Sequence, residues 1–268
     1  MADNDLLLLT RPQPGVVLLT LNRPERLNAL SGEAVQRLRD TLDELRADTS
    51  ARVVVITGAG RGFCAGWDLT SGGGGSGGTP GVTDLYAGQE LFAGMIHRLR
   101  DLDKVVIAAV NGVAVGAGMA ITLAADLRVA SKRAAFHVGA VRIGLTAGEC
   151  GISYHLPRLV GAARAFELML TGRPLPAEEA ERWGLVSAVV DDEQLLPHAL
   201  ELAALVTRNS PYATKHTKQL MWANLDAGSL DAALETENHA QILAVLTEDF
   251  KEAQRAFAEK RAPVFTGR

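Results

Sequence analysis

Short apolar runs alternate with amphipathic segments along the first two thirds of the chain. Buried strands are predicted at 15–22, 51–58, 105–112, 127–131 and 134–138, where β-branched and other apolar residues follow one another. Helices are predicted at 31–48, about 84–101 and 117–125, with Ser31 as the N-cap of the first. Strands that alternate with helices are typical of an α/β fold.

Beyond Gly161 the hydrophobic pattern becomes mostly helical. Helices are predicted to end at Gly172 and Gly184, and longer ones at 192–208, 211–226 and 231–260. We therefore expect an α/β core over residues 1–200 and a helical C-terminal region over residues 201–268.

Residues 105–125 carry no charge and are long enough to span a bilayer as a single helix. Asn111 and three glycines interrupt this run, its first half is β-branched, and no second span follows. This pattern favours a buried strand, a tight turn and a buried helix over a membrane helix.

The glycine-rich stretch 71–78 cannot hold regular structure, because glycine loses the most entropy on ordering. We interpret it as a loop, since a linker here would leave only about 70 residues before it, too few for an ample core. The G-x-S-x-G match at 74–78 lacks the strand and helix that a nucleophilic serine requires, so we treat it as accidental.

Composition narrows the choice of partners and compartment. A net charge of −4, a pI near 5.9 and 5% aromatic residues argue against nucleic acid as a partner. Cys64 and Cys150 are the only cysteines, which favours a reducing compartment over a disulfide framework. The acidic N-terminus does not resemble a signal peptide, so a cytoplasmic location is expected.

Two glycine-rich turns, "GFCAGWDL" at 62–69 and "NGVAVGAGMA" at 111–120, each follow a predicted strand. Such turns let the backbone approach a ligand closely and leave N–H groups unpaired, and two of these aimed at one point make an oxyanion hole. The alternative, a dinucleotide fingerprint in "VVVITGAGRGF", is weak because Phe63 stands where the third glycine is required.

These turns, with "LNRPERLNAL", "LPRLVGAARAFELMLTG", "AERWGLVSAVV" and "FAEKRAPVF", resemble the enoyl-CoA hydratase/isomerase, or crotonase, superfamily over nearly the whole chain. The resemblance implies a spiral of ββα units with a helical C-terminal trimerisation region, assembled as a trimer or dimer of trimers. It also implies an enzyme that binds acyl-CoA thioesters and stabilises an enolate, with no cofactor beyond the coenzyme A of the substrate.

The resemblance assigns the oxyanion N–H donors to Trp67 and Ala117. It places coenzyme A against Arg26, Ala29, Ala65, Asp68 and Leu69, and against Phe257 and Lys260, often from a neighbouring subunit. Trp67 could instead be an ordinary core aromatic, and Arg26 and Lys260 ordinary solvated charges.

The two glutamates that a hydratase of this family uses fall on Ala120 and Ala140, which cannot transfer a proton. Glu149 is similar in position to the single glutamate of Δ3,Δ2-enoyl-CoA isomerases. The alternative is that it caps a helix beginning near Ile152. His97 and His137 lie in apolar patterns typical of packed histidines, and no residue spacing suggests a metal site.

We therefore expect an acyl-CoA enzyme of the Δ3,Δ2-enoyl-CoA isomerase type with Glu149 as its catalytic residue. The alternatives are an atypical hydratase, another acyl-CoA enzyme, or a non-catalytic acyl-CoA-binding protein.

Overall fold

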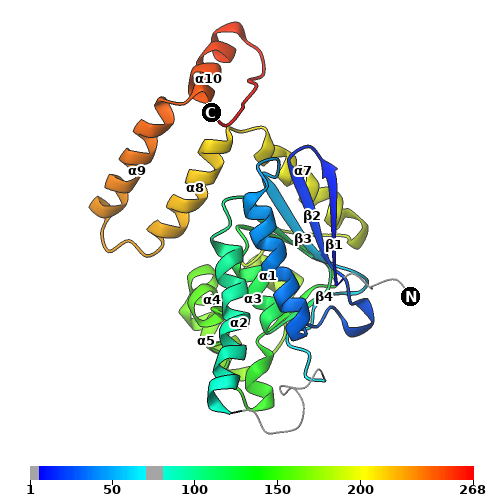
Figure 1. The fold of residues 1–268 in the computed structure, drawn as a ribbon. Coiled ribbons are helices and arrows are strands. Elements are labelled where there is room, and N and C mark those ends of the chain that lie inside the picture. The colour runs from blue at the N-terminus through cyan, green and yellow to red at the C-terminus, as the bar shows by residue number, and fades with distance from the viewer. Residues whose placement is uncertain (1–5, 71–80) are drawn as a thin grey trace.

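The computed structural model describes residues 6–70 and 81–268, and two largely parallel sheets form its centre (Figure 1). The larger sheet has the order β1 (Leu7–Gln13), β2 (Val16–Leu21), β3 (Val53–Gly58), β5 (Val105–Val110), β7 (Leu127–Ser131) and β10 (Ala188–Val190). The smaller has the order β4 (Gly62–Cys64), β6 (Val113–Val115), β8 (Ala135–His137) and β9 (Leu175–Pro176). Among the strands of residues 6–70 and 81–268, only β1 and β9 run antiparallel to their neighbours.

The chain contributes strands to the two sheets in turn, in a repeated unit of two strands and a helix. β3 and β4, then β5 and β6, then β7 and β8 each place one strand in the larger sheet and the next in the smaller. The first pair leads to α2 (Val82–Arg100), the second to α3 (Ala117–Ala124), and the third to α4 (Ile152–Val160) by way of the 3-10 helix Gly139–Ile143. This repetition is the spiral of ββα units that the resemblance implies.

The central strands read as continuous apolar runs because both faces of the larger sheet are covered. Val53 and Val55 of β3 face α7 (Leu195–Thr207), whereas Val54 and Ile56 face the main core beneath α1 (Gly32–Ala47), α2 and α3. Successive side chains of a strand point to opposite faces, so each valine is buried in one core or the other. As predicted, the Ser31 side chain caps α1 by accepting a hydrogen bond from Ala34 N–H.

After α5 (Ala162–Thr171), α6 (Ala177–Arg182) and α7, three helices extend away from the sheets: α8 (Pro211–Asn224), α9 (Leu230–Val245) and α10 (Glu248–Glu259) (Figure 1). α5 ends in a left-handed Gly172, as predicted. The prediction of one helix over 231–260 is wrong. The chain breaks at Leu246, and Thr247 caps α10 by accepting a hydrogen bond from Phe250 N–H.

Residues 105–125 form β5, β6 and α3, so the membrane-helix alternative is wrong. Within residues 6–70 and 81–268 no helix is long and apolar enough to cross a membrane. The glycine stretch 71–78 lies outside the described residues. The expected division after residue 200 falls inside α7, which packs on the larger sheet; a division between α7 and α8 fits the packing better, and stays a proposal.

Candidate active site

The first wall of the site is the extended segment that follows β4. Leu30 N–H donates to the Gly66 carbonyl at 2.7 Å, and Asp68 N–H donates to the Leu30 carbonyl at 3.0 Å. Peptide groups alternate in direction along an extended chain, so the Trp67 N–H between these bonds points to the opposite side. No described residue accepts a hydrogen bond from it.

The second wall is the start of α3, whose first residue is Ala117. The N–H groups of a first helical turn have no partner within the helix, and no described residue accepts from Ala117 N–H. A Cβ on Gly66 would lie 2.6 Å from the Val115 carbonyl oxygen and 3.6 Å from the Ala117 nitrogen. Glycine at 66 therefore lets the two walls touch, and the free N–H groups of Trp67 and Ala117 lie on neighbouring segments.

Two buried asparagines hold the loop between β3 and β4 in place. The Asn111 side chain donates to the carbonyls of Gly58, Gly60 and Gly62, and its oxygen accepts from Gly58 N–H at 3.0 Å. Asn28 donates to the Ala59 and Gly62 carbonyls. The carboxamide is suited to this task because it carries donors and an acceptor on one planar group.

Glu149 lies against the second wall. Its Oε1 would be 3.0 Å from a Cβ placed on Gly116, the residue just before Ala117. The side chain is half-buried and accepts no hydrogen bond from the described residues. Burial raises the pKa of its carboxyl above the ordinary glutamate value.

Glu149 precedes two left-handed residues, Cys150 at φ 46° and Gly151 at φ 77°. Gly151 is the N-cap of α4, and Ile152 N–H donates to the Glu149 backbone carbonyl at 2.8 Å. The Glu149 carboxylate takes no part in capping, so the helix-cap alternative lacks support. A non-glycine residue at positive φ is uncommon and often accompanies a functional site.

The two positions where the resemblance expects hydratase glutamates are apolar and buried, Ala120 in α3 and Ala140 in the 3-10 helix after β8. The packed-histidine prediction is wrong for His97, whose side chain is 78% exposed and pairs with Asp101 at 2.8 Å. His137 is half-buried, and burial together with nearby Arg142 lowers its pKa. Trp67 is 43% exposed and is not a core aromatic.

Five of the seven residues expected at coenzyme A lie on the first wall or on the segment that pairs with it. Ala29 and Asp68 are buried, Ala65 is half-buried, and Arg26 and Leu69 are exposed. The Asp68 carboxylate accepts hydrogen bonds from Thr70 and pairs with Arg23 at 3.0 Å, which lowers its pKa to about 2. Arg23 also donates to the Ala29 carbonyl at 2.6 Å, so it joins two of the expected contacts.

Phe257 lies on α10 and Lys260 is the C-cap of that helix, which Figure 1 shows at the end of the C-terminal extension, away from α3 and β4. Phe257 is 88% exposed. The single chain therefore does not bring this pair to the other expected site residues.

Sequence reasoning missed Arg23, Asn28, Asn111 and Cys150. The polar residues among glycines and prolines in "LNRPERLNAL" and "VNGVAVG" were an available signal for the first three. In the described part of the chain no group of three His, Cys, Asp or Glu side chains could hold a metal ion.

Comparison with known proteins agrees with this architecture. The family model for enoyl-CoA hydratase/isomerase matches residues 11–268. A probable enoyl-CoA hydratase of Mycobacterium tuberculosis is 47% identical over 268 residues, covering 97% of this chain and 93% of that protein. The crystal structure of a probable enoyl-CoA hydratase/isomerase from Mycobacterium abscessus superposes with a TM-score of 0.91 at 41% identity, covering 98% of this chain and 100% of the other.

A monofunctional enoyl CoA isomerase from M. smegmatis superposes with a TM-score of 0.74 at 43% identity, over 85% of this chain and 98% of that one. The fold of paired strands and helices is thus shared with proteins described as enoyl-CoA hydratases and isomerases. The chain belongs to the enoyl-CoA hydratase/isomerase family and has the crotonase fold.

Proposed function

We propose that this enzyme is a Δ3,Δ2-enoyl-CoA isomerase in which Glu149 is the catalytic residue. The observation that carries the proposal is the half-buried carboxylate of Glu149 against Gly116, one residue from the Ala117 N–H. Buried alanines at 120 and 140 remove the pair of acids that hydration would use. The similarity to an enoyl CoA isomerase from M. smegmatis adds support.

In the proposed reaction the Glu149 carboxylate removes a proton from C2 of a 3-enoyl thioester. The electron pair of that C–H bond forms a C1–C2 double bond, and the thioester carbonyl becomes an enolate oxygen. The N–H groups of Trp67 and Ala117 stabilise this oxygen. The same carboxylic acid then returns the proton at C4, where the electron pair of the C3–C4 double bond forms the new C–H bond. The C1–C2 pair moves to C2–C3, and the thioester carbonyl forms again.

The raised pKa of Glu149 suits this work because a base operates best when its pKa lies near the pH at which it acts. The two backbone N–H donors stabilise the negative charge of the enolate oxygen. The effect of such donors is large, because removing one oxyanion donor from an enzyme costs about a hundred- to a thousandfold in rate. No cofactor beyond the coenzyme A of the substrate enters the proposal.

We assign the coenzyme to Arg26, Ala29, Ala65, Asp68 and Leu69, with Phe257 and Lys260 supplied by a neighbouring copy in a homotrimer or dimer of trimers. The exposure of Phe257 and the distant position of α10 support the contribution in trans. A cytoplasmic location is supported by two buried cysteines that form no disulfide.

The test is Glu149→Gln, which keeps the shape of the side chain and removes its basicity. We expect a loss of about a hundredfold or more in conversion of 3-enoyl-CoA to 2-enoyl-CoA, with acyl-CoA affinity nearly unchanged in calorimetry. Glu201→Gln on the exposed side of α7 is the matched control and should keep wild-type turnover. Full turnover by Glu149→Gln, or a wild type inactive on every 3-enoyl-CoA, would contradict the proposal.

Assays on the same purified protein distinguish the isomerase from an atypical hydratase and from a binding protein. An atypical hydratase would add water to crotonyl-CoA at a substantial rate, whereas an isomerase with alanines at 120 and 140 should do so poorly. A binding protein would hold acyl-CoA and convert nothing, with or without Glu149.

A further inference from the structure

We propose that His155 is a positioning residue, whose imidazole transmits the docking of α8 to the turn that carries Glu149. This inference rests on the proposed function of Glu149. It assigns a role to a buried group that the proposed reaction does not use.

The Glu149 carboxylate depends on its backbone for its position. No described residue donates a hydrogen bond to it, and the two residues that follow, Cys150 and Gly151, are both left-handed. A side chain held only by a turn moves when the turn moves. Whatever packs against residues 149–151 therefore controls the distance between the carboxylate and Gly116.

His155 makes the nearest such contact, with Gly151. Ile96 lies farther off, 4.0 Å from a Cβ placed on Gly151, and Gln89 lies 4.0 Å from the Cys150 sulfur. His155 lies in the first turn of α4, is 5% exposed, and donates from its backbone N–H to the Gly151 carbonyl at 2.9 Å. A Cβ on Gly151 would lie 3.3 Å from Cδ2 of the imidazole and 3.6 Å from Nε2. The ring thus covers the Gly151 Cα directly, and any shift of the ring presses on the turn or leaves it unsupported.

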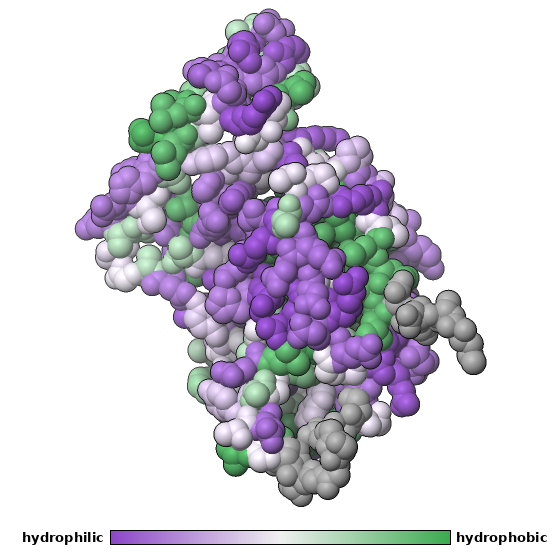
Figure 2. Space-filling view, viewed as in Figure 1, coloured by the Kyte–Doolittle hydropathy of each residue, from purple (hydrophilic) through white to green (hydrophobic). Residues whose placement is uncertain are grey.

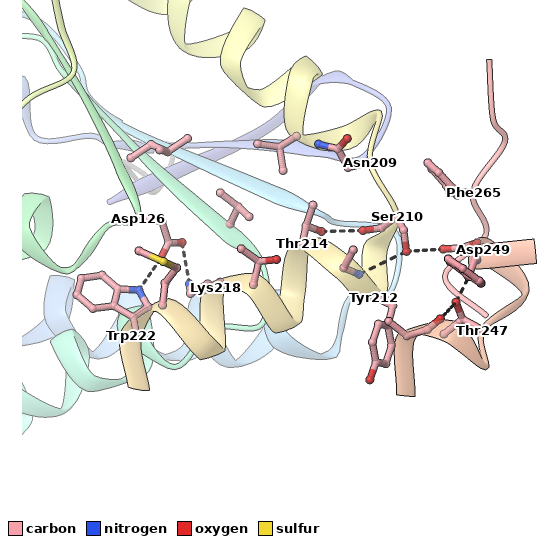
Figure 3. Close-up of a pocket in the computed structure, with 18 of the residues that line it drawn as sticks. Asp126, Asn209, Ser210, Tyr212, Thr214, Lys218, Trp222, Thr247, Asp249 and Phe265 are labelled. Carbon is pink, nitrogen blue, oxygen red and sulfur yellow. Dashed lines mark hydrogen bonds and ion pairs between the residues drawn. The ribbon is translucent and has the colours of Figure 1, made fainter. Parts of the chain in front are cut away.

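The other side of the ring faces α8. The rings of His155 and Trp222 meet edge to face with centroids 5.6 Å apart. Trp222 Nε1 donates to Asp126 at 2.7 Å, and Arg100 lies over the Trp222 ring at 3.8 Å. Asp126 also pairs with Lys218 of α8 at 2.9 Å, and Figure 3 shows Trp222 and Lys218 converging on this carboxylate.

These contacts form a continuous path from the position of α8, through Trp222 and His155, to Gly151 and Glu149. Trp222 and Lys218, where this path begins, also line a cavity of about 860 Å³ between the sheets and α8–α10. A movement of the C-terminal helices at this cavity would therefore change the position of the Glu149 carboxylate through these side chains, without any contact between α8 and the substrate.

The surroundings of the imidazole favour its neutral form. Burial, followed by the charges of Arg100, Arg128 and Arg158, lowers the pKa of His155 to about 4, and only Asp226 opposes that change. Nδ1 is buried and has no hydrogen-bond partner among the described residues. A phenyl ring would satisfy the same packing without an unpaired polar atom, so shape rather than protonation is the property that the proposal requires.

The test compares His155→Ala, which removes the ring, with His155→Phe, which replaces it by another. We expect His155→Ala to lower kcat for 3-enoyl-CoA by about ten- to a hundredfold with KM little changed, because a misplacement near 1 Å can cost about that much. His155→Phe should stay within about threefold of wild type, since it preserves the packing surface. His216→Ala, which removes a ring stacked on Tyr212 at 4.1 Å elsewhere on α8, is the control.

A pH profile separates positioning from mere stability. Release of the Glu149 carboxylate into water would bring its raised pKa down toward the ordinary value, so the rising limb of kcat should move to lower pH in His155→Ala. Cys150 beside it stays protonated in this range because burial, together with the Glu149 charge, raises its pKa to about 12. Wild-type kcat and an unmoved limb in His155→Ala, even with a lower melting temperature, would overturn the proposal.

A second variant and a crystal structure test the proposal where the first variant or the activity assay gives no result. If His155→Ala does not accumulate as folded protein, Trp222→Leu tests the same path from α8 and should lower kcat in the same way. If the wild type has no isomerase activity, the proposed function fails, and a crystal structure of His155→Ala decides alone. An unchanged Glu149 carboxylate against Gly116 would then overturn the positioning role.

Discussion

At the scale of single residues, Glu149 makes opposite contributions to stability and to the proposed catalysis. Burial raises the pKa of its carboxyl in the folded state, so the folded chain holds the proton more tightly than the unfolded chain. The stability linked to this proton is present below the ordinary pKa of glutamate and is lost as the pH rises through the folded value.

We therefore predict that Glu149→Gln is more stable than the wild type near pH 8 and that the difference disappears near pH 4, since glutamine does not titrate. Urea unfolding at the two pH values measures this, with Glu201→Gln as the exposed control. Equal stability of Glu149→Gln and wild type at both values would show that the carboxylate is not desolvated.

Some residues of the candidate site could be predicted from the sequence and others could not. The resemblance pointed to Trp67, Ala117 and Glu149, whose surroundings in the fold suit the roles proposed for them. It did not point to Asn111 or Asn28, because these side chains donate hydrogen bonds to the carbonyls of a loop that is distant in sequence. Nor could it indicate that Cys150 is left-handed, since local sequence favours that conformation only for glycine and, less strongly, for asparagine or aspartate.

At the scale of elements, α8 is held by a buried ion pair of Lys218, in addition to the more exposed pair of Lys215 with Asp103. The Lys218 side chain is 5% exposed, bonds to Asp126 and donates to the Lys104 carbonyl at 2.9 Å. Burial lowers the pKa of this lysine, with Asp126 opposing the shift. Removing one partner of a buried pair leaves the other charge without compensation in a medium of low polarity.

We predict that Lys218→Met lowers the free energy of unfolding by about 3 kcal/mol or more and loosens α8 in hydrogen exchange. Lys251→Met removes a solvent-exposed pair with Glu248 on α10 and should cost at most about 1 kcal/mol. Similar losses for the two variants would mean that the Asp126 pair does not hold α8 in place.

Strands were predictable where a continuous apolar run marked them rather than by length alone: the run 134–138 indicated the short β8, whereas β1 has seven residues with mostly exposed side chains and was not predicted. The runs that became β2, β3 and β5 are long enough to show a continuous apolar pattern, and so is the periodicity of α1. β4 and β6 have three residues each, too few for any period to appear, and pairing with distant strands defines them. The break at Thr247 followed from a local cap that competes with a helical pattern continuing on both sides.

At the scale of the whole molecule, α9 presents an apolar surface that the chain itself leaves uncovered. Figure 2 shows hydrophobic residues over α9 on one edge of the C-terminal extension. The exposed apolar side chains of this helix and its end include Leu230, Ile242, Leu243 and Leu246. An apolar face of this kind is typical of a surface that another protein copy covers, but the sequence of one chain does not contain the position of that copy.

We predict that the wild type elutes as three or six chains of 28.4 kDa in light scattering at micromolar concentration. The double variant Ile242→Asp with Leu246→Asp places charge on the apolar face and should dissociate the assembly, because burying an unpaired carboxylate is costly. Gln241→Asp adds charge at an exposed polar position of the same helix and should leave the assembly intact. If Phe257 and Lys260 reach a neighbouring site as proposed, the dissociated variant will also show a higher KM for acyl-CoA. A wild type that remains a monomer would remove both the assembly and that contribution, whereas dissociation with unchanged KM would remove only the latter.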